Sequence, residues 1–377
     1  MRRSPQGRLA AVVLKEFIQM RRDRLTFAMM VGIPLMQLIL FGFAINTDPK
    51  RLPTGIVSGD HSRYTRALVA AMANSGYFRI VDDDMTEAEA DRAIERGSVQ
   101  FALTIPPDFT RKLLRGERPR FLVEADGTDP AATSNALRAL EGISQRIWQK
   151  ELPGATSRVA GGAPAASLAI HARYNPEAIT QYNIVPGLMG VVLTMTMVII
   201  TSLAITREKE RGTMEHLLGT PVRPAEVMVG KIVPYIVVGY IQVVLVLLAA
   251  AFLFRVPVRG SIPLLLACAL LFIVANLSVG LTFSTVAKNQ LQAVQMSFFF
   301  FLPSILLSGF MFPFRGMPGW AQMIGSALPL THFLRIVRGI MLKGNGFADV
   351  AQHLVPIAAF CAIALAIGIR RYRQTLD

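Results

Sequence analysis

The sequence predicts an α-helical polytopic membrane protein with six transmembrane helices and an α/β domain inserted between the first and the second. Three observations support this fold class. The chain of 377 residues is 52% hydrophobic, which is too apolar for an ordinary soluble domain of this length. It also contains six long apolar runs. One polar segment, residues 46–183, separates the first run from the other five.

The six apolar runs are long enough to cross a bilayer, whose hydrocarbon core of about 30 Å needs about 20 apolar residues per helix. They cover residues 25–45, 184–205, 232–254, 262–287, 293–312 and 350–369, and none contains Asp, Glu, Lys or Arg. The last run is the least apolar at its start, where Gln352 and His353 lie. The first run is longer than the apolar region of a secretory signal peptide, about 7 to 15 residues, so we expect it to span the membrane.

Residues 46–183 have the pattern of a folded α/β domain. Strand-like runs alternate with helical patterns, which is typical of this class. The strand-like runs are TGIVSG, YFRIV, VQFALTI and RFLVEA, and the helical patterns are SRYTRALVAAMANSG, TEAEADRAIERG, FTRKLLRG and PAATSNALRALEGISQRIWQKEL. The stretch PGATSRVAGGAPAAS that follows is expected to be a flexible tether back to the membrane. The two cysteines, Cys268 and Cys361, fall in predicted spans and are expected to be small packing residues.

Basic residues set the orientation of the chain. An even number of spans places both termini on one side, where the segments carry 16 basic residues, whereas the short loops on the other side carry six. The positive-inside rule therefore predicts that residues 1–24, 206–231 and 370–377 are cytoplasmic and that residues 46–183 are extracytoplasmic. Residues 313–349 are expected to form short helices at the outer surface, with Trp320 in the headgroup layer.

The net charge of +14 is explained by this topology. Residues 46–183 carry 17 basic and 17 acidic residues, so the whole excess belongs to the membrane part. We therefore expect no nucleic-acid partner, although a basic chain can indicate one.

The chain lacks the residues that several classes of protein need for their function. The predicted spans hold no Asp, Glu, Lys or Arg that could carry a proton or bind a cation. HExxH, GxSxG, Cys/His clusters and a Walker A loop are missing from the sequence, so we expect no catalytic site, no metal site and no nucleotide-binding site. If the protein uses nucleotide hydrolysis, another chain must bind the nucleotide.

Four side chains in the predicted spans are candidates for a translocation path: Met189, Gln242, Asn276 and Phe298. Three of them have a simpler alternative. Gln242 and Asn276 are the polar residues in the middle of spans and are equally suited to hydrogen bonds between helices. The run 298–301 of four phenylalanines is also typical of a lipid-facing or core-packing surface.

Two segments have the pattern of amphipathic helices beside the membrane. Residues 207–218, REKERGTMEHLL, combine alternating charges with an apolar side. The alternative is an ordinary solvated extension of the preceding span. In residues 1–24, one helical face carries Leu9, Val13, Phe17 and Met20, and the opposite face is basic. A basic flank that only orients the first span would explain the charges but not the apolar stripe.

The stretch REKERGTMEHLLGTPVRPAEVMVGKIVPY resembles the signature of ABC-2 type transporter permeases, the membrane subunits of bacterial ABC exporters. LKEFIQMRRDRLTF, RYNPEAITQYNIVPGLMG, LPSILLSGFMFP and LPLTHFLRIVRGIML agree with the same family, so the resemblance covers essentially the whole chain. The layout, with a large domain after the first span, is similar to the multidrug-efflux subgroup. The resemblance implies that residues 1–24 form a cytoplasmic elbow helix and that residues 206–231 hold a coupling helix that docks on an ATP-binding subunit. The motif positions are Arg207, Glu208, Glu210, Arg211, Gly212, Thr213 and Glu215.

The function implied is that of a permease subunit of an ATP-driven exporter, which moves amphipathic, drug-like compounds out of the cell through the bacterial inner membrane. ATP and Mg would be bound by the partner subunit, and this chain would not be an enzyme. The expected partners are an ABC ATP-binding subunit, a second permease chain, identical or paralogous, and membrane lipids. Two alternatives stay open. One is a lipid or polysaccharide exporter of the same family, and the other is a membrane-anchored sensor or assembly factor with an external ligand-binding domain.

Overall fold

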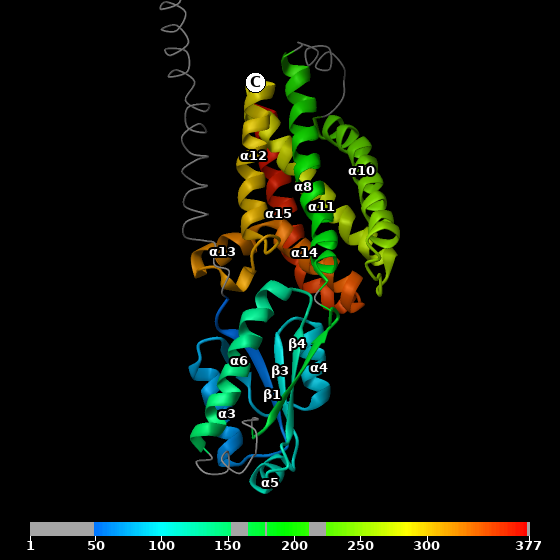
Figure 1. Cartoon of the computed structure of the whole chain (residues 1–377). Coiled ribbons are helices and arrows are strands. Elements are labelled where there is room, and N and C mark those ends of the chain that lie inside the picture. The colour runs from blue at the N-terminus through cyan, green and yellow to red at the C-terminus, as the bar shows by residue number, and fades with distance from the viewer. Residues whose placement is uncertain (1–48, 152–164, 178, 211–223, 375–377) are drawn as a thin grey trace, which may run out of the picture.

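The computed structural model describes residues 49–151, 165–177, 179–210 and 224–374. They form a bundle of long helices with an α/β domain at one end (Figure 1). The elbow helix, the first predicted span, most of the predicted tether and residues 211–223 lie outside the described residues. Six spans, and the insertion of the domain between the first two, therefore stay predictions.

The α/β domain is built on a five-stranded sheet with the order β2-β1-β3-β4-β5. Neighbouring strands are parallel except for β3 and β4, which are antiparallel. The strands are β1 (Leu52–Ser58), β2 (Phe78–Asp82), β3 (Phe101–Ile105), β4 (Arg120–Asp126) and β5 (Ser167–Arg173). The first four correspond to the predicted strands. The fifth begins where the sequence predicted the end of a flexible tether, and it pairs along its whole length with β4.

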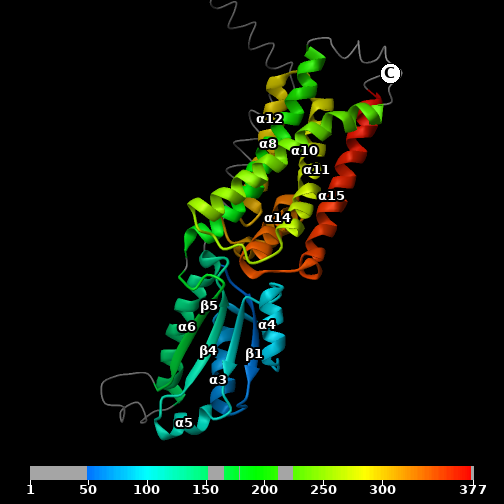
Figure 2. The ribbon, with the colours of Figure 1, turned by 90° about the vertical axis from the view of Figure 1, so that its right-hand side faces the viewer.

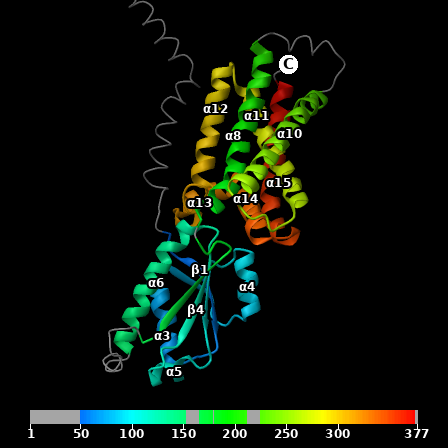
Figure 3. The ribbon, with the colours of Figure 1, turned by 45° about the vertical axis from the view of Figure 1, so that its right-hand side comes forward.

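Helices cover both faces of this sheet (Figure 3). α3 (Arg63–Asn74), α5 (Phe109–Arg115) and α6 (Pro130–Glu151) contribute to the larger core, and α4 (Glu87–Glu95) packs on the opposite face. Phe109 and Trp148 join α5 to α6, with ring centroids 5.7 Å apart. α4 begins with a capping box in which the side chains of Thr86 and Glu89 satisfy each other's backbone N–H groups. A local sequence signal therefore fixes the start of α4.

Five described helices are long and apolar enough to cross a membrane. They are α8 (Thr180–Glu210), α10 (Pro224–Leu248), α11 (Ile262–Val286), α12 (Gln290–Leu307) and α15 (Phe347–Gln374). These helices correspond to the second to sixth apolar runs of the sequence analysis. α10 ends at Leu248 and is followed by the π-helical turn η2 (Ala249–Leu253), and α12 ends at Leu307, before the predicted end at residue 312. α11 is the central helix, since it packs on both α8 and α15 (Figure 2).

Glycine allows α8 and α11 to approach each other closely. A Cβ atom at Gly280 of α11 would lie 2.5 Å from the backbone oxygen of Val198 and 2.9 Å from the Cβ of Thr201, both on α8. Small residues at such crossings bring two backbones into van der Waals contact, which is a main source of helix association in membranes. This crossing therefore holds the middle of the bundle.

Residues 313–349 fold into the turn η3 (Phe314–Gly316), α13 (Gly319–Ala327), α14 (Pro329–Arg338) and the π-helical turn η4 (Gly339–Lys343). The sequence predicted short surface helices here. α13 fits that description, with Trp320 exposed, but α14 is buried against α8, α11 and α15. Phe333 of α14 stacks on Phe272 of α11, with ring centroids 4.0 Å apart. The prediction missed this because α14 is too short and too polar to span a bilayer, whereas its packing depends on helices distant in sequence.

Candidate functional site

Two polar sites lie at the two ends of the helical bundle. We call the end that carries the α/β domain the domain end and the opposite end the coupling end. The C-terminal end of α8, the N-terminal end of α12 and the C-terminal end of α15 all lie at the coupling end (Figure 1). α8 runs from one end to the other, so it connects the two sites.

At the coupling end, Glu210 binds the first residue of α12. The backbone N–H of Gln290 donates to Oε1 of Glu210 at 2.8 Å, and the side-chain amide of Gln290 donates to Oε2 of the same carboxylate. Asn289 caps α12 by accepting the backbone N–H of Gln292 at 2.8 Å. The carboxylate therefore occupies a helix N-terminus, where the free N–H groups and the helix dipole stabilise a negative charge.

These hydrogen bonds also set the charge state of Glu210. The bond from the Gln290 side chain, followed by the bond from its backbone, lowers the pKa of Glu210 below its usual value, and the nearby Arg207 acts in the same direction. The carboxyl is fully exposed, so the contact lies on the surface of the coupling end. It ties the last residue of α8 to the first residue of α12.

A polar seam continues this link into the bundle. The hydroxyl groups of Ser202 on α8 and Ser297 on α12 lie 3.0 Å apart, and both residues are buried. Each hydroxyl also has a partner in its own helix, the backbone oxygen of Ile199 for Ser202 and that of Ala293 for Ser297. Hydrogen bonds between membrane helices contribute about 0.6 kcal/mol on average. The Ser202–Ser297 contact therefore fixes the alignment of α8 and α12 but adds little to the stability of the bundle.

Only part of the predicted docking motif lies in the described residues. Arg207 and Glu210 are exposed at the end of α8, and Glu208 belongs to the same helix. The other four motif positions, Arg211, Gly212, Thr213 and Glu215, lie outside the described residues. So do the elbow residues Leu9, Val13, Phe17 and Met20. The motif's docking role stays a prediction.

The four path candidates are not brought together around one opening. Met189 is fully buried in the bundle core. Gln242 of α10 accepts a hydrogen bond at 2.8 Å from Thr196 of α8, so it joins two helices. Asn276 is fully buried and donates to the backbone oxygen of Phe272 in its own helix, while its Oδ1 has no hydrogen-bond partner in the described part of the chain.

The fourth candidate, Phe298, lies on the surface of α12. It is 37% exposed, and its ring contacts that of Phe301 edge to face at 6.5 Å between centroids. A position on the bundle surface suits contact with lipid or with another chain. The role of all four residues in a path stays a prediction.

The site at the domain end was not predicted from the sequence. Three donors from the bundle meet backbone oxygens at the C-terminal end of α4. Lys343 donates to Ile94 at 3.0 Å, Asn345 to Glu95 at 3.4 Å and Arg315 to Gly97 at 3.0 Å. The last carbonyl groups of a helix lack partners within the helix and carry partial negative charge. Two cations and an amide therefore bind the partly negative end of this helix.

A buried ion pair stands at the centre of this site. Nζ of Lys343 lies 2.6 Å from Oδ2 of Asp126, and the two side chains are only 7% and 10% exposed. The other carboxylate oxygen of Asp126 accepts from the backbone N–H and the hydroxyl of Thr128, at 3.1 and 2.7 Å. The ammonium group also lies over the ring of Tyr174, 5.3 Å from its centroid. Burial, followed by the charge of Asp126, raises the pKa of Tyr174 to about 12.

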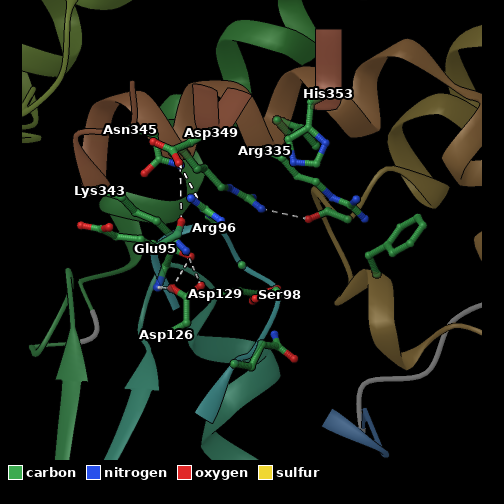
Figure 4. Close-up of a pocket in the computed structure, with 18 of the residues that line it drawn as sticks. Glu95, Arg96, Ser98, Asp126, Asp129, Arg335, Lys343, Asn345, Asp349 and His353 are labelled. Carbon is green, nitrogen blue, oxygen red and sulfur yellow. Dashed lines mark hydrogen bonds and ion pairs between the residues drawn. The ribbon is translucent and has the colours of Figure 1, made fainter. Parts of the chain in front are cut away.

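A cavity of about 460 Å³ lies beside this ion pair, between the α/β domain and the bundle (Figure 4). Its wall mixes both signs of charge, with Glu95, Arg96 and Asp126 from the domain and with Lys343 and Asp349 from the bundle. Arg96 and Asp349 form a second ion pair across the interface at 3.6 Å. The sequence signal for this site was the group of basic residues in 313–349. In the sequence analysis these residues were interpreted only as charges of an outer loop.

Comparison with known proteins identifies the family. The sequence model of the family described as "ABC-2 family transporter protein" matches residues 24–370. The chain therefore belongs to this family of transporter permeases. It is similar to the probable multidrug ABC transporter permease YbhS of Escherichia coli (strain K12), at 32% identity over 98% of both chains. It is also similar to the inner membrane transport permease YhhJ of the same organism, at 30% identity over 91% of this chain and 93% of YhhJ. The predicted resemblance is therefore confirmed.

A third relative is much longer than this chain. ABC transporter G family member 20 of Dictyostelium discoideum is 25% identical over 89% of this chain, but the match covers only 46% of that protein. Membership in the family places the chain in an ABC transporter system, which has an ATP-binding partner. Together with the apolar helices, it identifies a multi-pass membrane permease.

Proposed function

We propose that this chain is the permease subunit of an ATP-driven exporter that moves amphipathic, drug-like compounds out of the cell. Residues 207–218 form the helix that docks on a separate ATP-binding subunit, and the motion of that subunit reaches the bundle through α8 and α12. The observation that carries the proposal is the contact of Glu210 with Gln290. It joins the start of the predicted docking segment to two helices at once.

In this mechanism, closure of the ATP-binding subunits pushes on the docking helix and tilts α8 and α12, which correspond to the second and fifth predicted spans. The bundle changes from inward-facing to outward-facing and releases the compound outside. ATP can shift this equilibrium only by as much as it stabilises one state over the other. The exposed position of the Glu210 contact and the small energy of the Ser202–Ser297 seam suit a joint that must adjust during the cycle.

The proposed orientation puts the coupling end and both termini in the cytoplasm of a bacterial cell, and the α/β domain outside the inner membrane. Its support is the count of basic residues in the sequence, 16 in the predicted cytoplasmic segments against six in the short loops on the other side. Arg207, Arg370 and Arg371 lie near the ends of α8 and α15 that point away from the α/β domain. Basic residues collect on the cytoplasmic side of membrane proteins.

A second permease chain, identical or paralogous, completes the exporter in this proposal. α10 exposes a row of large apolar side chains, which suits contact with lipid or with another helix bundle. The row contains Val237, Ile241, Val244, Leu245 and Leu248. The drug-like substrate class follows from the similarity to YbhS, which is named a probable multidrug ABC transporter permease.

The docking role is tested by an affinity pull-down of the full chain from native membranes in mild detergent, followed by an ATPase assay on the eluate. We expect the wild type to bring down an ATP-binding subunit and the Glu210→Arg, Glu215→Arg double variant to lose it. The matched control is Glu87→Arg, Glu141→Arg, which makes the same charge change at exposed positions of the α/β domain. A wild type that folds stably but brings down no ATPase refutes the exporter function.

A second variant separates docking from force transfer. Gln290→Leu removes the side-chain hydrogen bond to Glu210 and leaves residues 207–218 unchanged. We expect normal recovery of the ATP-binding subunit with fewer molecules of a fluorescent amphipathic dye exported per ATP. Equal export per ATP in wild type and variant would show that α8 and α12 do not move through this contact.

A further inference from the structure

A second cavity at the domain end has a wall with only one sign of charge. It has a volume of about 610 Å³ and lies between the start of β1 and β2 on one side and η3, α13 and α14 on the other. Among the described residues, five cationic side chains line it and no carboxylate does. They are Lys50, Arg51, Arg79, Arg315 and Arg335.

These five cations have no ionic partner among the described residues. Lys50 lies 5.7 Å from the ring centroid of Tyr77, and Arg335 lies 4.8 Å from that of Phe314. Arg315 donates one hydrogen bond, to Gly97. A guanidinium group has five N–H donors, so most of the donors around this cavity remain available.

The cations are close enough to destabilise one another. Burial, followed by the charges of Arg335 and Arg79, lowers the pKa of Arg315 to about 10. Like charges that gather around one space raise the energy of the folded protein unless an anion enters it. Arginine forks match the oxygen geometry of phosphate groups and bind them through two hydrogen bonds at a time.

The neighbouring helix indicates where the anion comes from. One face of α13 exposes three large side chains at helical spacing, Trp320 at 40%, Met323 at 70% and Ile324 at 45%. Gln322 of the same helix lines the cavity and donates to the backbone oxygen of Met317 at 2.8 Å. A short helix with an exposed tryptophan and apolar neighbours suits the interface of a bilayer, the depth at which lipid phosphates lie.

We propose that this cavity binds the phosphate headgroup of an anionic phospholipid from the leaflet next to the α/β domain, with the acyl chains passing along the apolar face of α13. Five positive charges select a phospholipid of net negative charge over a zwitterionic one. The bound lipid joins the α/β domain to the bundle, since Arg79 belongs to the first and Arg335 to the second. The proposal uses the membrane position of the bundle given under the proposed function, but it does not depend on ATP or on the exported compound.

The test is a titration of the purified full chain, without its ATP-binding partner, with three probes. These are short-chain phosphatidylglycerol, short-chain phosphatidylcholine and inorganic phosphate, and the readout is isothermal calorimetry in a neutral detergent. We expect phosphatidylglycerol to bind about tenfold or more tightly than either of the others. Equal affinity for the two lipids overturns the proposal, and inorganic phosphate that binds as tightly as phosphatidylglycerol overturns the lipid assignment.

Variants place the binding in this cavity. Arg79→Gln, Arg335→Gln is expected to lose the preference for phosphatidylglycerol, and Arg79→Lys, Arg335→Lys is expected to retain part of it because the charge remains. Arg66→Gln, Arg120→Gln is the matched control, since both residues are exposed in the α/β domain and line no part of this cavity. If the first variant does not fold, Arg79→Gln alone, on an exposed strand position, makes the same test. Unchanged affinity in the folded glutamine variants overturns the proposal.

Discussion

Replacement of Lys343 by methionine tests whether the buried ion pair holds the α/β domain on the bundle. The change removes the hydrogen bonds to Asp126 and to the Ile94 carbonyl and leaves a buried carboxylate without its cation. Removing one partner of a buried pair costs about 3–5 kcal/mol. Each 1.4 kcal/mol is about tenfold in an equilibrium constant, so we expect the interface to open about 100 to about 4,000 times more often.

Hydrogen exchange of the full chain in lipid nanodiscs measures this opening at the amides of residues 93–99. The matched control is Lys112→Met, because Lys112 also lies 2.6 Å from a carboxylate, that of Asp108, but with side chains that are 43% and 28% exposed. An exposed pair contributes about 0–1 kcal/mol, so the control is expected to change exchange little.

The double variant Lys343→Met, Asp126→Asn completes the test. It removes the uncompensated charge, so we expect it to recover most of the protection lost in Lys343→Met. Exchange in Lys343→Met that is indistinguishable from that in Lys112→Met would refute the reasoning, since burial would then make no difference to the pair. A double variant that opens as often as Lys343→Met would show that packing, and not the charge, is responsible.

Two further predictions concern the bundle. Because the pKa of Glu210 is depressed in the folded chain, its contact with Gln290 stabilises the fold above the ordinary glutamate pKa and loses this effect as the pH falls through the lower, folded value. The protection factor of the Gln290 amide should therefore fall below about pH 4, and a Glu210→Gln variant, which has no titrating group there, should show no such change. Gly280→Ala should destabilise the fold by about 1–3 kcal/mol in denaturant unfolding, because its methyl group would meet the Val198 backbone oxygen. Gly319→Ala, where nothing lies within 4 Å of the new atom, should change stability by less than about 0.5 kcal/mol.

The sequence predicted those features that depend on local patterns. Five apolar runs became five long helices, and four runs with strand character became four neighbouring strands, because hydrophobic length and period are properties of a short window. β5 was missed because its side chains are half-exposed on both faces and its place depends on pairing with β4, 47 residues earlier along the chain, as in the contact of His171 with Glu124. Lone strands at the edge of a sheet carry little sequence signal.

The same difference between local and long-range patterns applies to the two candidate sites. The docking segment could be predicted because its charges stand together in sequence and resemble a family motif, and its role stays a prediction. The domain-end site was not, because it joins Lys343 to Asp126 across 217 residues and Arg315 to the end of α4 across 218. Neither residue has a neighbour in sequence that distinguishes it from an ordinary loop charge. Only the fold, which places the C-terminal end of α4 beneath η4, gives these cations their partners.

The connection between the two sites limits how the bundle can move. β5 leads through Tyr174 into α8, whose 31 residues span about 46 Å at 1.5 Å per residue. The helix is therefore fixed at the domain end by the contacts around Lys343 and in its middle by the close approach to Gly280, whereas the contact described at its coupling end is exposed. A force applied at Glu210 therefore acts on the end of α8 that is held least firmly. Rotation of α8 about the Gly280 crossing preserves the tightest packing, whereas sliding along α11 would bring side chains against that backbone contact. We therefore expect the coupling end to move first, with the α/β domain following only after its ion pairs have rearranged.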